Sequence, residues 1–333
     1  MSSTLTFLSV IWYQLTFNPK PPPPEIKAEG ETAIVTGSNV GLGFEAAKQL
    51  ASRGLARLIL AVRDISKGEV AKAAISRENP KCQIEVWQLD QDSWDSMSAF
   101  ARKAQSLDRL DILLLNAGMK RLEYTRSPAG HETHIQVNHL STALLSLLLL
   151  APLRKTAAIT GKPSRMTITA SILAFIAAVD GITHPKAEII PTLDDPVSFK
   201  PGVDRYCLSK LLNILWTREL AKHVDAKELV INMCNPGWCM SEFHREDPGA
   251  AAAGKYLGWS SEQGAHLLVD AALQHPESHG EYLSEQRVRS VSGFVLSAQG
   301  QVAQKRIWDE TLALLREVVG QDHPIIRSDR LFL

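Results

Sequence analysis

The sequence predicts an α/β protein built as a single doubly wound domain, with a central parallel sheet of about seven strands and helices on both faces. Short apolar runs alternate with longer segments of helical periodicity along most of the 333 residues. The apolar runs are continuous, which is typical of strands that are buried on both faces of a parallel sheet. No internal repeat divides the chain, so we assign one domain to residues 25–333.

The elements of this domain follow one another in regular order. Strands are expected at 32–37, 56–62, 83–89, 111–116, 164–170, 229–235 and 280–284. Helices are expected from Leu42 to a stop at Gly54 and at 66–78, 93–105, 131–151, 204–223 and 302–319. The segment 172–202 is long, rich in Pro and Asp and weakly periodic, and such segments in a compact domain are usually functional.

We expect residues 1–24 to form an apolar helix and a proline-rich connector. Leu5, Leu8, Trp12 and Leu15 recur at helical spacing, and NPKPPPP at 18–24 ends any helix before it. The run is shorter than the roughly 20 apolar residues of a membrane-spanning helix. We favour packing of this helix on the domain. A peripheral membrane contact, or a cover over the mouth of a pocket, is the alternative.

The overall charge of the chain is balanced. Lys and Arg together number 36, as do Asp and Glu, so no global charge attracts nucleic acid or an anionic membrane. The four cysteines form no CxxC pair, and we interpret them as free buried thiols of a protein in the reducing cytoplasm. The histidines of HETH (131–134) lack the spacing of H-E-x-x-H, so no metal is expected.

A glycine-rich turn, TGSNVGLG at 36–43, stands directly between the first strand and its helix. Its glycines permit a tight turn and a close approach of ligand to backbone, while the helix N-terminus attracts a phosphate. Strand, turn and helix in this order predict a dinucleotide site and hence a Rossmann-type domain. Contacts to the dinucleotide are expected from Gly37, Ser38, Asn39, Gly41, Leu42 and Gly43.

The end of the second strand, AVRD at 61–64, indicates which dinucleotide is bound. An acidic residue there would hold the ribose hydroxyl of NAD, whereas an arginine accommodates the 2′-phosphate of NADP. Arg63 is the first charged residue after the apolar run, and Asp64 follows it. We therefore predict NADP(H) as the cofactor.

Tyr206 and Lys210 lie one helical turn apart in DRYCLSK (204–210), so they share a face of the predicted helix. A free tyrosine has a pKa near ~10, and a neighbouring lysine cation favours the phenolate. Tyr206 is thus a candidate proton donor and acceptor, with Lys210 as the group that adjusts it. Ser171 follows the fifth strand, where active-site residues of open α/β sheets collect, and its hydroxyl would hold a substrate oxygen against Tyr206.

Together these motifs resemble the short-chain dehydrogenase/reductase family. The resemblance is carried by TGSNVGLG (36–43), Asp90, NAG (116–118), Asn138, Ser171, YCLSK (206–210) and NPG (235–237). It implies that Tyr206 and Lys210 also lie against the cofactor, with Lys210 on the nicotinamide ribose, and that Asn138 holds a water between Lys210 and solvent. The remaining cofactor contacts that it implies are Asp90 at the adenine, Asn116, Ala117 and Gly118 in support, and Pro236 and Gly237 on the nicotinamide side.

Two longer motifs, LDRLDILLLNAG (107–118) and YCLSKLLNILWTREL (206–220), resemble the retinol-dehydrogenase-like branch, which also holds many fungal biosynthetic enzymes. This implies a bulky, apolar alcohol, aldehyde or ketone as substrate. We place it against the segments 172–202 and 238–262. In the second segment, apolar area for the pocket wall, or for simple core packing, comes from Trp238, Met240, Phe243, Tyr256 and Trp259.

We therefore predict an NADP(H)-dependent oxidoreductase of secondary metabolism that interconverts a carbonyl and an alcohol, chiefly by reduction. One alternative is a dinucleotide-binding regulatory protein that has lost catalysis, because a fold does not determine a function. The other is an isomerase or dehydratase that uses the same site. The protein is expected to be a monomer or a homodimer.

Overall fold

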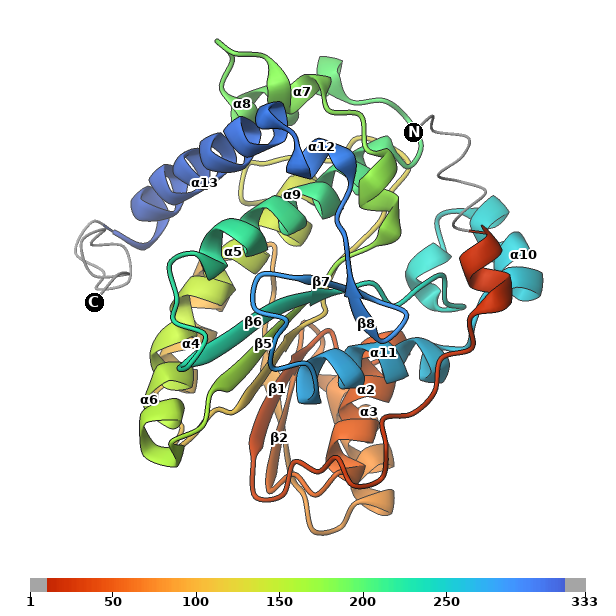
Figure 1. Ribbon diagram of the computed structural model, residues 1–333, viewed down its shortest axis with the longest axis vertical. Coiled ribbons are helices and arrows are strands. Elements are labelled where there is room, and N and C mark those ends of the chain that lie inside the picture. Colours follow the sequence, from red (N-terminus) through yellow and green to blue (C-terminus); the bar gives the residue numbers. More distant parts are fainter. Residues whose placement is uncertain (1–10, 321–333) are drawn as a thin grey trace.

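The computed structural model describes residues 11–320, which form one sheet of eight strands in the order β3-β2-β1-β4-β5-β6-β7-β8 (Figure 1). The strands are β1 Thr32–Thr36, β2 Arg57–Val62, β3 Gln83–Gln88, β4 Ile112–Leu115, β5 Ser164–Thr169, β6 Leu229–Cys234, β7 Tyr282–Ser284 and β8 Arg287–Arg289. β8 alone is antiparallel to its neighbour. The strand order reverses between β1 and β4, as in doubly wound sheets, and the predicted fold class is confirmed.

Helices cover both faces of this sheet (Figure 1). One face carries α2 (Gly41–Ser52), α3 (Ile65–Glu78) and α11 (Ser261–Leu273), and the other carries α4 (Trp94–Gln105), α5 (Ser141–Leu148), α6 (Leu150–Thr160) and α9 (Asp204–Ala221). Alternate strand residues supply the two cores, since Ala33 and Val35 of β1 join the first group and Ile34 the second.

The long helix predicted over 131–151 is wrong in its bounds and its continuity. The structure has a π-helix, η1, at Ile135–Leu140, then α5, and a break at Leu149 before α6. Pro152 accounts for the break, because its nitrogen has no hydrogen to donate to the end of α5. α6 then continues beyond the predicted end to Gly161, whose φ of +68° terminates it.

Two further elements differ from the prediction. α11 lies in a stretch for which no helix was predicted, although Ser260 and Gln263 form a capping box, which is a recognisable helix start. β8 follows β7 through a two-residue turn of Glu285 and Gln286, both at positive φ (56° and 55°). Such turns usually carry Asn or Gly, so no hairpin signal was visible.

The segment 172–202 is largely helical and packs against the C-terminal helix. It contains η2 (Ile172–Ile176), α7 (Asp180–Thr183), α8 (Ile189–Asp194) and η3 (Pro196–Ser198), while the C-terminal helix, α13, spans Ala298–Val319. The carboxylate of Glu310 on α13 accepts hydrogen bonds from the backbone N–H groups of Ile189 (2.6 Å) and Ile190 (3.1 Å). Glu310 therefore caps the start of α8 and ties this segment to the body of the domain.

The N-terminal segment packs on the domain, as favoured, but through a different face. Residues 11–16 are helical, and Tyr13 and Phe17 lie against Trp259, with ring centroids 5.1 and 5.9 Å away. Trp12 and Leu15 of the predicted packing face are 71% and 61% exposed. The other two residues of that face, Leu5 and Leu8, lie outside the described residues.

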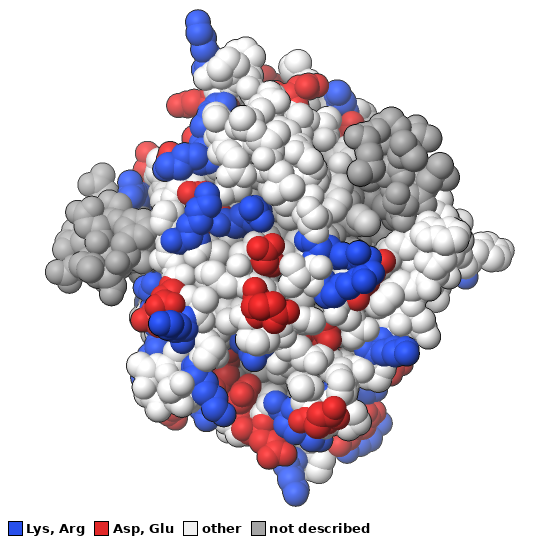
Figure 2. All heavy atoms as spheres, viewed as in Figure 1, with Lys and Arg blue, Asp and Glu red and all other residues white. Residues whose placement is uncertain are grey.

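Charged side chains of both signs are interspersed over the face shown in Figure 2, in keeping with the zero net charge. Over residues 11–320, no single helix is long and apolar enough to cross a membrane. Only the bent pair Ile135–Leu148 and Leu150–Thr160 passes by length and composition, and its first member is buried in the core.

Candidate active site

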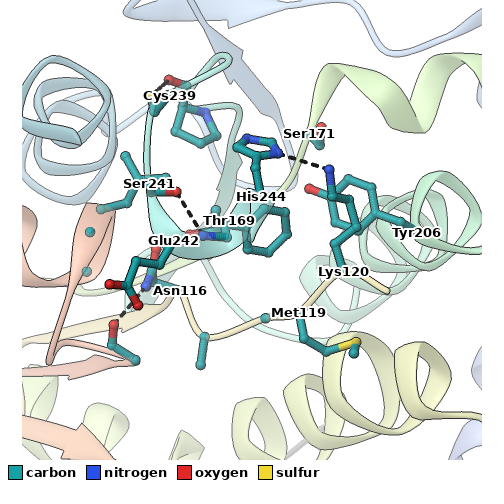
Figure 3. Close-up of a pocket in the computed structure, with 18 of the residues that line it drawn as sticks. Asn116, Met119, Lys120, Thr169, Ser171, Tyr206, Cys239, Ser241, Glu242 and His244 are labelled. Atoms are coloured by element: carbon teal, nitrogen blue, oxygen red, sulfur yellow. Dashed lines mark hydrogen bonds between the residues drawn. The ribbon is translucent and has the colours of Figure 1, made fainter. Parts of the chain in front are cut away.

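A cavity of about 680 Å³ opens at the carboxyl ends of the strands, where Rossmann-type sheets bind their ligands. Its walls come from the glycine turn, the ends of β2, β4, β5 and β6, and the segment that follows β6. The N-terminal helix contributes Ile11, Tyr13 and Gln14 to the rim. Figure 3 shows Ser171 and Tyr206 on one side of this pocket and Asn116 on the other.

The glycine turn has the shape that a pyrophosphate requires. Gly37 and Gly41 adopt φ values of +66° and +63°, which L-residues rarely do. A Cβ on Gly43 would stand 2.3 Å from the carbonyl oxygen of Gly37, so only glycine fits. No side chain caps the start of α2, which leaves its N–H groups to a ligand. This turn therefore fits a dinucleotide.

Asn116 and Thr36 join the ends of β4 and β1 beneath this turn. The Asn116 side chain donates to the Thr36 carbonyl at 3.0 Å, and the Thr36 hydroxyl accepts from the backbone N–H groups of Asn116 and Ala117, each at 3.0 Å. The prediction did not include Thr36. Ser38 differs from expectation, because its hydroxyl turns inward to the Val35 carbonyl (2.9 Å) and its side chain does not line the cavity.

The end of β2 presents a basic edge to the cavity. Asp64 is committed to α3, because its carboxylate accepts from the Ser66 hydroxyl (2.6 Å) and the Lys67 backbone (3.2 Å) as the helix N-cap. Arg63, Asp64 and Lys67 all line this end of the cavity, so two cations stand beside one carboxylate. Lys67 was not predicted to contact the cofactor. The sequence does show that it lies in the first helical turn after Asp64. Asp90 also lines this end, and its carboxylate accepts from the Asp92 N–H at 3.0 Å.

Ser171, Tyr206 and Lys210 come together at the end of β5. Tyr206 and Lys210 are buried on α9, and Ser171 is the residue from which η2 begins. Burial raises the pKa of the Tyr206 phenol well above its ordinary value, and a hydrogen bond with Ser171 acts in the opposite direction. The phenol is therefore protonated at neutral pH.

The predicted effect of Lys210 on the pKa of Tyr206 is not seen in the structure. The Lys210 ammonium donates to the Thr169 carbonyl at 2.8 Å and lies 6.0 Å from the centre of the Tyr206 ring. Burial dominates, so the pKa of Lys210 falls to about 8 while that of Tyr206 rises. Spacing on a helix placed the two residues on one face, but it could not show how far both would be desolvated.

This burial makes Lys210 costly to the fold, which gives a prediction for stability. The pKa of Lys210 falls from 10.5 to about 8, because the folded state disfavours the charged ammonium. Below pH 8 this lowers the free energy of unfolding by its full amount. Between pH 8 and 10.5 the folded chain loses this proton before the unfolded chain does, and the penalty disappears. Without cofactor, Lys210→Met should therefore be more stable than wild type by about 3 kcal/mol at pH 7. Denaturant unfolding should show the difference vanishing towards pH 10.5, and a difference independent of pH would contradict this account.

Asn138 lies in the π-helix η1, an unusual element that is often found at functional sites. Its amide donates to the Met119 carbonyl and the Ser209 hydroxyl, each at 2.9 Å, and its oxygen accepts from the Met119 N–H at 2.8 Å. A Cβ on Gly118 would lie 3.1 Å from that oxygen and 3.5 Å from Lys210 Nζ. Asn138 and Lys210 thus meet at Gly118, and the water predicted between Lys210 and solvent stays a prediction.

The NPG motif follows β6 and forms part of the cavity wall. The Asn235 oxygen accepts from the N–H groups of Ile172 (3.1 Å) and Gly237 (3.3 Å), so this side chain joins both predicted pocket segments. Gly237 has φ +76°, and a Cβ there would stand 2.3 Å from the Trp259 ring. Pro236 and Gly237 both line the cavity. No role was predicted for Asn235, the first residue of this motif.

The two predicted pocket segments contribute unequally. Of 172–202 only Ile172, Leu173 and Ile176 line the cavity, because the rest packs on α13. The second segment contributes more, through η4 (Glu242–His244) and α10 (Pro248–Leu257). Of its aromatic residues, Trp238 and Phe243 line the cavity, Trp259 is core, and Tyr256 is 89% exposed.

The histidines of HETH are held by carboxylates. His131 Nδ1 lies 2.7 Å from Asp194, and His134 Nδ1 lies 2.7 Å from Glu132. The guanidinium of Arg205, next to Tyr206 in the chain, lies 4.0 Å from Glu132. These contacts fasten the start of α9, and so Tyr206, to the loop before η1 and to α8.

A dinucleotide cradle at the first strand–helix turn, with half-buried Ser171 and buried Tyr206 and Lys210 beside it, defines a dinucleotide-dependent oxidoreductase. A family model described as short chain dehydrogenase matches residues 31–175. The short chain dehydrogenase sol3 of Alternaria solani is 53% identical over 277 residues, covering 83% of this chain and 96% of sol3. The short chain dehydrogenase/reductase mfmJ of Annulohypoxylon moriforme is 38% identical, covering 93% and 92%. The chain belongs to the short-chain dehydrogenase/reductase family.

A solved structure supports the fold assignment. The Pseudomonas aeruginosa RhlG/NADP active-site complex superposes with a TM-score of 0.60 at 24% identity, covering 78% of this chain and 96% of RhlG. The prediction of family is thus confirmed, and the curated relatives come from fungi, as the resemblance implied.

Proposed function

We propose that this protein is an NADP(H)-dependent oxidoreductase that reduces a ketone or aldehyde on a bulky, apolar molecule of secondary metabolism. The observation that carries the proposal is the hydrogen-bonded pair of half-buried Ser171 and buried Tyr206 at the cofactor cradle, with the phenol protonated. A protonated tyrosine is a proton donor, which suits reduction of a carbonyl to an alcohol. NADPH, when bound, supplies the hydride to the carbonyl carbon.

Each of the other steps of the reaction is assigned to a side chain of this site. The Ser171 hydroxyl holds the carbonyl oxygen, and the Tyr206 hydroxyl donates the proton to that oxygen as negative charge develops on it. Lys210 is held by Thr169 at the floor of the site, where it would contact the nicotinamide ribose. Asn138, bonded to Ser209 on α9, would position the water that returns a proton from solvent.

NADP(H) rather than NAD(H) is supported by the end of β2. One oxygen of Asp64 is used as a helix cap, while Arg63 and Lys67 place two cations beside it at the cavity edge. A 2′-phosphate carries the charge that such an edge attracts. The bound NADP of the structural relative RhlG agrees with this choice.

The apolar character of the substrate rests on the pocket walls. Leu173, Ile176, Trp238 and Phe243 surround the space next to Tyr206. The N-terminal helix at 11–16 adds Ile11 and Tyr13, so this helix is part of the pocket wall. We place the protein in the cytoplasm as a monomer or homodimer, with a peripheral membrane contact through Trp12 and Leu15 as the alternative.

The proposed function is tested by mixing the protein with NADPH and decalone, a bulky apolar ketone, and following NADPH absorbance together with the product by mass spectrometry. Reduction predicts one alcohol formed for each NADPH consumed. Product without loss of NADPH would instead indicate an isomerase or dehydratase. Tight NADPH binding with no product from decalone or from the aldehyde decanal would favour the inactive regulatory protein.

A further inference from the structure

A buried lysine stands in the part of the pocket that faces Tyr206. Lys120 follows the NAG motif, and its side chain is only 4% exposed. Its Nζ lies 6.0 Å from the centre of the Phe243 ring, and that ring lies 5.4 Å from the ring of Tyr206. All three residues line the cavity (Figure 3 labels Lys120 and Tyr206). An apolar residue here would cost the fold less than a cation, so the charge itself requires an explanation.

Two residues of the segment after β6 hold the ammonium group in place. The Asp247 carboxylate accepts from Lys120 Nζ at 2.8 Å, and His244 Nδ1 lies 2.9 Å away (Figure 3). Burial, and then the Lys120 charge, lower the pKa of His244 to about 4, so the ring is neutral and its Nδ1 accepts a hydrogen bond from the Lys120 ammonium. The other Asp247 oxygen caps α10 by accepting from the Ala250 N–H at 2.9 Å.

One hydrogen of this ammonium group has no protein acceptor. A lysine ammonium has three hydrogens, and the bonds to Asp247 and His244 use two. Between residues 11 and 320, no third acceptor is bonded to Nζ.

We propose that Lys120 determines substrate specificity by binding an acidic oxygen, an enol or a carboxylate, that the substrate carries near its reacting carbonyl. The inference rests on the proposed function and names the substrate class more narrowly. The carbon skeleton lies against Trp238 and Phe243, while the third hydrogen of Lys120 bonds the acidic oxygen. A charge-assisted hydrogen bond is strong in a desolvated pocket, and a ketone without that oxygen leaves the donor unpaired.

The test measures binding to the protein loaded with NADP⁺, so that no turnover is needed. Isothermal titration compares two matched pairs of ligands: benzoylacetone, which enolises, against benzylacetone, and benzoylpropionate, a carboxylate, against butyrophenone. We expect the acidic member of at least one pair to bind about tenfold or more tightly than its neutral partner. The pair that shows the preference tells an enol from a carboxylate.

The same titrations are made on Lys120→Met and on the double variant Lys120→Met/Asp247→Asn, which leaves no unpaired acid. The ratio of affinities between the acidic ligand and its neutral partner should fall to near one in both variants. Lys255 is exposed on α10, so Lys255→Met should keep the wild-type ratio. Equal affinities within both pairs in wild type, or a preference that survives Lys120→Met, would overturn the inference. Failure of the proposed function would appear differently, as ligand binding in wild type without NADPH oxidation.

Discussion

We expect Tyr206→Phe to lower NADPH-dependent turnover of decalone by roughly a thousandfold, while the affinity for NADPH changes little. The substitution removes only the hydroxyl that bonds Ser171 and donates the proton. The ring stays, and it continues to pack against Phe243. Steady-state rates and NADPH titration by fluorescence, measured on the same preparation, separate the two effects.

Tyr256→Phe is the matched control for this experiment. Tyr256 is 89% exposed on α10 and does not line the cavity, so its loss of a hydroxyl should leave both turnover and NADPH affinity at wild-type values. If Tyr206→Phe keeps more than about a tenth of wild-type turnover, Tyr206 is not the proton donor.

The second large effect is expected at the basic edge of the cavity. Replacing Arg63 and Lys67 together with alanine should weaken NADP⁺ binding by about a hundredfold, because two charge-assisted contacts to the 2′-phosphate are lost. NAD⁺ has no such phosphate, so its affinity should change by less than about threefold. Calorimetric titration of both dinucleotides gives the ratio directly.

Lys72→Ala controls for the general charge of α3, because Lys72 lies on the same helix but pairs with Glu69 at 3.3 Å and stays outside the cavity. It should leave the NADP⁺ to NAD⁺ ratio unchanged. Equal weakening of both dinucleotides in the Arg63 and Lys67 variant would show that these residues support the helix rather than read the phosphate.

Much of the site was accessible from the sequence because its signals are local. The glycine turn, the strand-end arginine and the helical spacing of Tyr206 and Lys210 each depend on a few neighbouring residues. Their positions relative to one another then follow from the parallel sheet, which brings the carboxyl ends of its strands to one edge. Ser171 could be placed beside Tyr206 for this reason alone.

The parts that were missed depend on contacts between distant residues. Lys120 and Asp247 are 127 positions apart, and Gln14 bonds the backbone of Trp238 across 224 positions. No periodicity or short motif reports such pairs. The same limit explains why the segment 172–202 looked like pocket wall, since its docking on Glu310 is a contact with the far end of the chain.

The central claim is that this site transfers hydride from NADPH to a carbonyl carbon, and one measurement tests it most directly. The wild-type protein is incubated with NADPH deuterated at the reactive nicotinamide carbon and with decalone, decanal or benzylacetone, and the products are analysed by mass spectrometry. Our account predicts an alcohol that carries one deuterium on the former carbonyl carbon, and no labelled alcohol from Tyr206→Phe. Bound ligands with no labelled alcohol, or a product without deuterium, would contradict it.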